Sequence, residues 1–190
     1  LTLDVVKSSE IEGETLNPQQ VRSSIARRLG MDIAGSVQAD RNVEGVVEMT
    51  LDATQNFDKP LSAERLFGWQ AALFPAGAWR DDAKGPMQVV SGPMGRESVH
   101  FEAPAAGLLD LEMSRFIEWA NTPDSTDPVL RSALAHLWFV TVHPFDDGNG
   151  RIARAIADWI LAQADNTAQR FYSMSAQIRQ ERNAYYDILE

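Results

Sequence analysis

The chain has 190 residues and no cysteine, which excludes disulfides and thiolate metal sites and fits a reducing compartment. With 17 basic and 27 acidic residues its net charge is −10, which disfavours direct nucleic-acid binding because backbone phosphates attract a basic surface. No apolar run approaches the roughly 18 residues of a membrane span, and no signal peptide is evident. We therefore expect one cytoplasmic domain that binds neither nucleic acid nor a membrane.

Helical patterns follow one another along most of the chain. Three of the expected starts carry capping signals, which are Asn17 before a proline, Ser62, and Asp127 before a proline. We expect helices at 3–12, 18–29, 43–55, 63–74, 108–119, 128–143, 149–162 and 175–189. Two β-prone runs, 87–91 and 98–101, flank a Gly/Pro turn at 92–95 and predict a hairpin. The sequence therefore predicts an all-α domain with a single small hairpin.

One stretch, His143 to Arg154, gathers polar and charged residues between two apolar helical runs. Pro144 cannot continue a helix, so the first run should end at the imidazole of His143. Two glycines further on permit a tight loop. The second helix should then begin near Asn149, with its unpaired N–H groups and positive dipole end facing the loop. This arrangement predicts an anion site with an imidazole at its rim.

These residue types suit transfer of a nucleotidyl group from a nucleoside triphosphate to a hydroxyl. An imidazole titrates at about pH 6.5, so His143 can accept the hydroxyl proton. Asp147 offers the hard oxygen ligand that Mg²⁺ prefers. Arg151 and Arg154 lie one helical turn apart and offer forked donors to the terminal phosphates. Backbone N–H groups and one amide complete the phosphate cradle, from Gly148, Asn149 and Gly150.

The stretch resembles the signature of the Fic family, His-Pro-Phe-x-Asp/Glu-Gly-Asn-Gly/Lys-Arg-x-x-Arg, at every specified position. The resemblance implies a helical bundle with a hairpin flap and an enzyme that transfers AMP from ATP, with Mg²⁺, to a protein hydroxyl. It assigns the base to His143 and the metal ligand to Asp147, and it makes Phe145 a buried anchor. The remaining motif residues would bind ATP: Gly148, Asn149, Gly150, Arg151 and Arg154.

The resemblance also assigns two regions outside the motif. Tyr185 and Tyr186 match a position that lines the adenine pocket in similar proteins. Adjacent helix residues point about 100° apart, so we expect one ring to touch the base. The alternative, that both are core or interface aromatics, stays open. The hairpin residues Ser98, Val99 and His100 are expected to hold the target segment by backbone pairing, a task that suits an exposed strand edge.

Residues 8–13 fit a second Fic pattern, the inhibitory motif Ser/Thr-x-x-x-Glu-Gly/Asn. Ser8 and Glu12 are four residues apart, so on a helix they share one face. This allows Glu12 to pair with Arg154 while Ser8 reaches toward Asn149. An arginine held in this way cannot also grip the γ-phosphate. We expect residues 1–16 to form an inhibitory segment and 17–190 the Fic core, within one compact domain.

The main hypothesis is a protein adenylyltransferase, held off by Glu12, that uses ATP and a Ser, Thr or Tyr hydroxyl of a protein substrate. The substrate could be the chain itself, and a homodimer is compatible with the sequence. Two alternatives stay open. In the first, Glu12 orients a water that removes AMP from a modified protein. In the second, the pocket binds nucleotide without reaction and the protein is a regulator.

Overall fold

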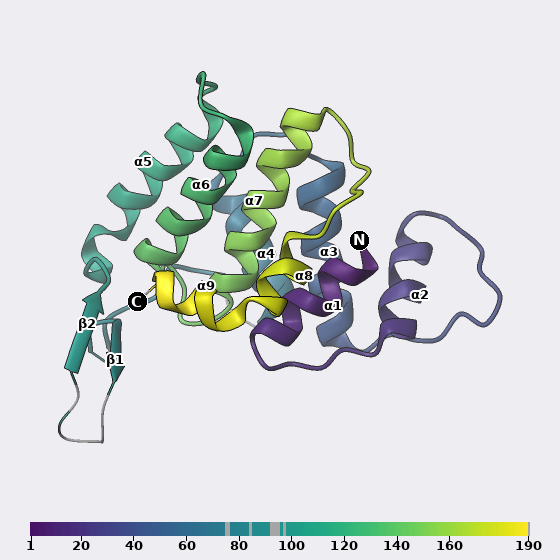
Figure 1. The fold of residues 1–190 in the computed structure, drawn as a ribbon, viewed down its shortest axis with the longest axis horizontal. Coiled ribbons are helices and arrows are strands. Elements are labelled where there is room, and N and C mark those ends of the chain that lie inside the picture. The colour runs from purple at the N-terminus through teal and green to yellow at the C-terminus, as the bar shows by residue number, and fades with distance from the viewer. Residues whose placement is uncertain (75–76, 84, 92–95, 97, 190) are drawn as a thin grey trace.

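The computed structural model describes the chain except for residues 75–76, 84, 92–95, 97 and 190 (Figure 1). Helices dominate the described part, and one antiparallel two-stranded sheet accompanies them, so the predicted all-α fold with a hairpin is confirmed. The helices are α1 (Thr2–Ile11), α2 (Pro18–Arg28), α3 (Arg41–Gln55), α4 (Ala63–Leu73), α5 (Leu109–Asn121), α6 (Pro128–Val142), α7 (Asn149–Asp165), α8 (Met174–Gln180) and α9 (Arg182–Leu189). The strands are β1 (Gln88–Ser91) and β2 (Ser98–Glu102), and a short 3-10 turn (Ala106–Leu108) precedes α5.

Helices α6 and α7 form the centre of the bundle, with α3 and α4 behind them (Figure 1). Every residue of α7 from 151 to 162 is buried, because neighbouring helices cover it on all sides. Phe139 on α6 and Ile152 and Trp159 on α7 have no exposed surface. Burying an apolar side chain of this size stabilises a fold by about 1.5–3 kcal/mol. The loop that joins α6 to α7 is therefore anchored at both ends in the best-packed part of the molecule.

The predicted capping residues act as expected. Asn17, Ser62 and Asp127 each accept a backbone N–H from the first turn of α2, α4 and α6, at 2.9, 3.1 and 2.9 Å respectively. Each cap satisfies one or two of the four N–H groups that a helix start leaves unpaired, and is worth about 1 kcal/mol. These local signals explain why the sequence locates the helix starts within one or two residues.

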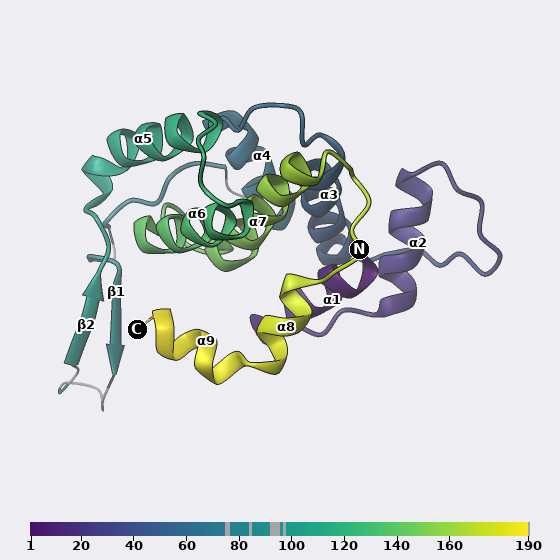
Figure 2. The same ribbon diagram turned by 45° about the horizontal axis from the view of Figure 1, so that its top comes forward.

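The hairpin of β1 and β2 projects from one end of the bundle (Figures 1 and 2). Its register pairs Gln88 with Glu102 and Val89 with Phe101, and a bulge shifts the ladder after Val89. Residues 98–100 of β2 are exposed. The predicted turn at 92–95 lies outside the described residues. The hairpin thus offers backbone away from the core, at the end of the bundle where α6 finishes.

The single helix predicted for 175–189 is wrong, because the structure divides this segment into α8 and α9. Glu181 lies between them with φ −103° and ψ 32°, and its carbonyl then accepts the N–H of Tyr185 at 2.9 Å to start the next helix. Helix α8 lies along α1, whereas α9 turns toward the hairpin (Figure 2). The segment contains no glycine or proline, so packing against α1, rather than a local breaker, accounts for the break.

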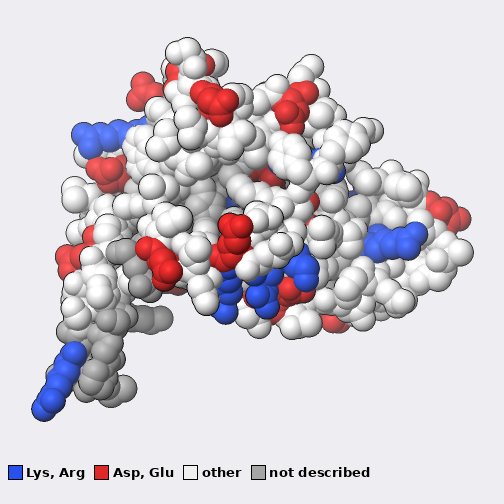
Figure 3. All heavy atoms as spheres, viewed as in Figure 1, with Lys and Arg blue, Asp and Glu red and all other residues white. Residues whose placement is uncertain are grey.

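On the face shown in Figure 3, acidic and basic side chains are interspersed over the helices. This surface therefore carries no single continuous basic stripe of the kind that follows a nucleic-acid backbone. In the described part of the chain, none of the helices combines the length and apolarity that crossing a bilayer requires.

Candidate active site

His143 ends α6 in the left-handed conformation, with φ 49° and ψ 59°. Its N–H still bonds the carbonyl of Phe139 at 3.0 Å, so the residue closes the helix, and Pro144 then directs the chain into the loop. Arg80 Nε donates to the His143 carbonyl and Arg80 N–H to the Pro144 carbonyl, both at 2.8 Å. The buried Arg80 therefore clamps the start of the loop. Sequence reasoning missed this residue, because an isolated arginine far from the motif carries no signal.

The environment of His143 keeps its imidazole neutral. Partial burial lowers the pKa of His143 below its ordinary value, against a hydrogen bond to the backbone of Val140 that raises it. The charge of Arg80 lowers the pKa further, whereas the carboxylates of Asp147 and Glu12 raise it. Because the net shift is downward, the ring at pH 7 is a proton acceptor and not a cation.

Asn149 holds the loop closed through its side-chain amide. Its Oδ1 accepts the N–H of Phe145 at 3.0 Å and its Nδ2 donates to the Phe145 carbonyl at 2.7 Å. The ring of Phe145 is fully buried and lies 5.1 Å from Trp79, centroid to centroid, which agrees with the predicted anchor. In this arrangement the Asn149 amide binds the loop itself, so the group it can offer to a phosphate is its backbone N–H at the start of α7.

Two glycines let other groups approach the loop. Gly148 has φ 86°, and a Cβ there would lie 2.9 Å from the ring of Phe74, so a side chain is excluded on both counts. A Cβ on Gly150 would collide with the carboxylate of Glu12. The helix start is therefore open to an anion, and in this structure the anion beside it is the Glu12 carboxylate.

Asp147 stands on the exposed side of the loop, where its Oδ1 accepts the N–H of Gly148 at 2.6 Å. Its other oxygen is turned to no partner among the described residues. Within those residues no cluster of three or more His, Cys, Asp or Glu side chains could hold a metal alone. This donor set fits Mg²⁺, which usually takes one or two carboxylates and completes its shell with phosphate oxygens and water.

Both motif arginines point from α7 toward the segment that follows α1. Arg154 is 1% exposed, and its Nη2 bonds the Glu12 carboxylate at 2.7 Å and the Ser8 carbonyl at 3.0 Å. Its Nε donates to Ser8 Oγ at 2.9 Å. The expected Glu12–Arg154 pair is present in the structure. The expectation that Ser8 reaches Asn149 is wrong, because Ser8 bonds Arg154 while the Asn149 amide is taken by Phe145.

A cavity of about 250 Å³ opens beside His143. It is walled by the end of α6, by the hairpin and by Tyr186 of α9, and its lining residues are Met87, Gln88, Val89, Phe101, Ala103, Leu137, Val140, Thr141, His143 and Tyr186. The walls are mostly apolar, so the cavity suits a flat ring more than a charged group.

The two tyrosines have different places. Tyr186 lines the cavity, whereas the hydroxyl of Tyr185 bonds Nε2 of the buried His136 at 2.8 Å. Burial raises the pKa of Tyr185 and lowers that of His136 to about 4, so both partners are uncharged at neutral pH. Of the predicted pair, one ring thus faces the cavity beside His143 and the other braces α9 against α6.

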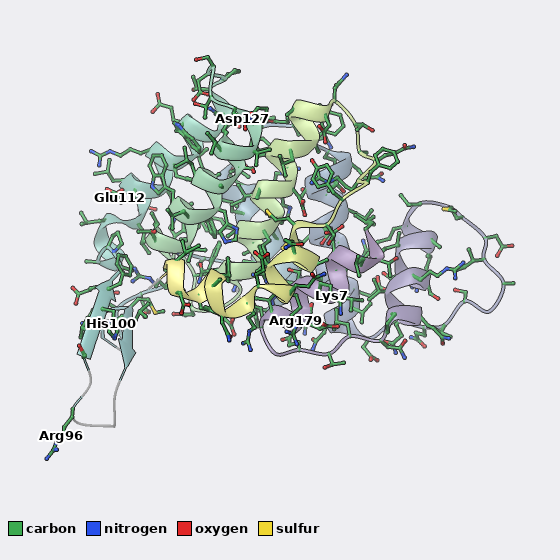
Figure 4. The ribbon with its side chains drawn as sticks, in the orientation of Figure 1. Lys7, Arg96, His100, Glu112, Asp127 and Arg179 are labelled. Atoms are coloured by element: carbon green, nitrogen blue, oxygen red, sulfur yellow. The ribbon has the colours of Figure 1, made fainter. Side chains whose placement is uncertain are left out.

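The three hairpin residues singled out by sequence, Ser98, Val99 and His100, are exposed on β2 and do not line this cavity. The hairpin contributes Met87 to Val89 and Phe101 to the cavity wall instead. Figure 4 places His100 on the strand and Arg96 at the far tip of the hairpin. The hairpin therefore carries both the exposed strand residues and part of the cavity wall, and both lie at the end of α6 that carries His143.

Residues 60–161 match the model of the Fic/DOC family, and this match covers more than half of the chain. The chain belongs to the Fic/DOC family. A second family model, described as a domain of unknown function (DUF4172), matches residues 1–31. These residues include α1 and the segment after it whose acids bind Arg151 and Arg154.

Similar curated proteins carry the name protein adenylyltransferase Fic. That of Culex quinquefasciatus is 38% identical over 89 residues, which are 46% of this chain and 17% of that protein. That of Drosophila mojavensis is 27% identical over 191 residues, which are 98% of this chain and 35% of that protein. The chain therefore spans about a third or less of the length of these relatives.

Solved structures share the fold. A Fic family protein from Desulfovibrio desulfuricans G20 superposes with a TM-score of 0.68 at 24% identity, covering 99% of this chain and 55% of that chain. Fic-1 from C. elegans, residues 134–508, superposes with a TM-score of 0.64 at 25% identity, covering 99% of this chain and 54% of that chain. The architecture is thus that of the Fic helical bundle.

Proposed function

We propose that this chain transfers AMP from ATP to a Ser, Thr or Tyr hydroxyl of a protein, and that Glu12 holds the reaction off. The observation that carries the proposal is the placing of one neutral imidazole, His143, beside the N-terminus of α7 and two buried arginines. This combination of a proton acceptor and an anion site matches the needs of nucleotidyl transfer. The names of the similar proteins point to the same reaction.

In the proposed reaction, the acceptor hydroxyl loses its proton to His143 as its oxygen attacks the α-phosphorus of ATP. A new P–O bond forms on the acceptor, the bond to the β-phosphate oxygen breaks, and pyrophosphate leaves. The N–H groups at the start of α7 and the guanidinium groups of Arg151 and Arg154 stabilise the negative charge on the phosphates. A Mg²⁺ ion held by Asp147 would neutralise charge on the same phosphates.

The rest of the nucleotide and the target would use the surfaces next to His143. The apolar cavity beside Tyr186 has room for a purine ring, and an aromatic side chain is a good stacking partner for one. The exposed strand residues Ser98, Val99 and His100 would pair with the backbone of the target. This pairing would bring the acceptor hydroxyl of the target to the end of α6, next to the imidazole of His143.

The proposed brake is the Glu12–Arg154 pair. The Arg154 side chain is only 2% exposed and is bonded to both Glu12 and Ser8, so its guanidinium cannot reach a phosphate while these partners hold it. A γ-phosphate would have to displace the carboxylate or settle elsewhere. We therefore infer that ATP binds in an unproductive pose until Glu12 moves.

The proposal is tested with the Glu12→Gly protein, incubated with Mg²⁺ and ATP labelled at the α-phosphate. We expect label on the protein itself or on lysate proteins, and none when His143→Ala is added to the same variant. Glu10→Gly is the matched control, because Glu10 lies in the last turn of α1, two residues before Glu12, and pairs with Lys7 rather than with a motif arginine. Label that is absent from Glu12→Gly, or equal with and without His143, would contradict the proposal.

One observation favours a second candidate reaction at the same site. The Glu12 carboxylate lies against Gly150 in the first turn of α7, and its charge is among those that raise the pKa of His143. In this alternative, Glu12 would orient a water for the removal of AMP from a modified protein. On this alternative, Glu12→Gly abolishes AMP release while leaving transfer intact. A regulator that binds ATP without reaction would instead show binding unaffected by His143→Ala and no turnover in either Glu12 form.

A further inference from the structure

Both motif arginines are held by acids from the same short segment after α1. Arg154 Nη2 bonds Glu12 at 2.7 Å, and Arg151 Nη1 bonds Glu14 Oε2 at 2.8 Å. We propose that Glu14 is a positioning residue that acts through Arg151, keeping its guanidinium from the triphosphate as a second restraint beside Glu12. This inference rests on the proposed function, because it concerns the same phosphate site.

The ion pair of Arg151 and Glu14 is set in a partly dry environment. The Arg151 side chain is 6% exposed and that of Glu14 is 38% exposed. The guanidinium carbon of Arg151 also lies 5.1 Å from the centroid of the Phe74 ring, which covers one face of the group. Its buried Nε has no hydrogen-bond partner within the described residues. The carboxylate is therefore the main counter-charge of this arginine, and a phosphate oxygen would compete for the same donors.

The backbone couples the two acids. After α1 the N–H groups of Glu12 and Glu14 both bond the carbonyl of Ser9, at 3.1 and 2.9 Å. Gly13 between them has φ 82°, a conformation that glycine adopts without strain. One tight turn thus presents both carboxylates to α7. Removing the Glu12 side chain alone leaves this turn, and with it the Glu14–Arg151 pair, in place.

A second cavity, beside the Glu14–Arg151 pair, can receive the Glu14 carboxylate when it leaves Arg151. This cavity of about 210 Å³ adjoins the pair and is lined by Glu14, Arg41, Asn42, Leu73, Phe74 and Arg151. Arg41 forms no hydrogen bond or ion pair with another residue of the described chain. The carboxylate can therefore leave Arg151 for the cation and amide at the start of α3 without losing all electrostatic compensation. This lowers the cost of giving Arg151 to the nucleotide.

The inference predicts that Glu12→Gly is only partly released. In that variant Arg154 is free, whereas Arg151 still has a carboxylate that a β-phosphate must displace. The double variant Glu12→Gly with Glu14→Gln frees both arginines and keeps the shape of the side chain at position 14. ATP should then bind more tightly, whereas AMP should not, because it lacks the β- and γ-phosphates.

The test measures the Kd of ATP and of AMP by calorimetry, with Mg²⁺, for Glu12→Gly and for the double variant. We expect the double variant to bind ATP about three- to tenfold more tightly, the range of a half-buried ion pair, and AMP with unchanged affinity. In transfer assays, KM for ATP should fall by the same factor with kcat within about twofold. A Glu14→Asp version, which keeps the charge, should return ATP binding toward that of Glu12→Gly.

Glu10→Gln in the Glu12→Gly protein is the control for loss of one negative charge near the site. Glu10 pairs with Lys7 at 2.8 Å and with Arg179 of α8 at 3.5 Å, and neither of these cations belongs to the motif. Figure 4 shows Lys7 on α1 and Arg179 on α8. ATP affinity in the double variant that is unchanged or weaker, or that shifts equally for AMP or with Glu10→Gln, would overturn the inference. No ATP binding in any variant would overturn both proposals, whereas tighter ATP binding without AMP transfer would contradict only the proposed function.

Discussion

The loop between α6 and α7 follows His143, which borders the same cavity as the hairpin of β1 and β2, yet the two regions are built in opposite ways. Phe145 in the loop has no exposed surface, and the loop is closed by the Asn149 amide and clamped by Arg80. On the hairpin, Val99 is 51% exposed and residues 98–100 face solvent. The region that would do chemistry is fixed by buried contacts, and the region that would meet a protein target keeps its backbone available.

This contrast has a physical reason. Transfer between two groups needs reacting atoms held to within fractions of an ångström, which only well-packed elements achieve. Recognition of an extended target by a strand edge needs open N–H and C=O groups, which a packed core would cover. Changes in the loop should therefore reduce stability, whereas changes at the exposed residues 98–100 of the hairpin, which do not line the cavity, should reduce the use of protein targets.

The largest expected effect comes from emptying the anchor of the loop. Phe145→Ala removes a ring packed against Trp79, Phe67 and Phe139, and should destabilise the protein by about 3–5 kcal/mol, as other buried Phe truncations do. Chemical unfolding monitored by circular dichroism measures this loss. The control is Phe171→Ala, because that ring is 85% exposed and its loss should cost less than about 0.5 kcal/mol. Equal losses of stability in the two variants would contradict the claim that buried contacts of Phe145 fix the loop.

A smaller effect is expected in the hairpin. Val99→Pro deletes a backbone N–H from β2, at the position paired with Val90, and proline cannot continue the ladder there. In the Glu12→Gly protein we expect modification of a protein target to fall by about tenfold, the value of one or two lost backbone hydrogen bonds. ATP affinity should stay the same. Val99→Thr, which keeps the N–H, should retain activity; a matching loss in that variant would mean that the side chain, not the backbone, matters.

The smallest expected effect is in the pH profile. His143 must be neutral to accept a proton, and its pKa lies below the ordinary value of 6.5, so the midpoint of the loss of activity in acid should also lie below pH 6.5. Glu12→Gly removes a charge that raises this pKa, which moves the limit further toward acid. The kcat of Glu12→Gly should therefore vary less than about twofold between pH 6.5 and 7.5. A steep decline in kcat when the pH is lowered from 7.5 to 6.5 would mean that the pKa of the base is higher than the environment of His143 predicts.

Much of the architecture could be predicted because its signals are local. Capping residues such as Asn17 and Ser62 mark helix starts, and Pro144 marks the end of α6 next to the imidazole. The Glu12–Arg154 pair could also be predicted, because the inhibitory motif at residues 8–13 indicated it.

The parts that could not be predicted depend on contacts between distant residues. Arg80 reaches the loop across 63 positions of sequence, and Glu14 meets Arg151 across 137. The break between α8 and α9 at Glu181 reflects packing on α1 and leaves no mark in composition. Spacing along one helix can show which side chains share a face, but it cannot show which distant arginine or acid will meet them.

The most direct test of the account is a crystal structure of Glu12→Gly with Mg²⁺ and a non-hydrolysable ATP analogue. We predict a triphosphate on the N–H groups that open α7, with Arg151 and Arg154 on its outer phosphates and the α-phosphorus on the His143 side. An acceptor oxygen would then fit about 3–3.5 Å from that phosphorus and within hydrogen-bond reach of the imidazole. A nucleotide bound elsewhere, with the His143 ring turned into the core and the start of α7 covered by other side chains, would contradict the account.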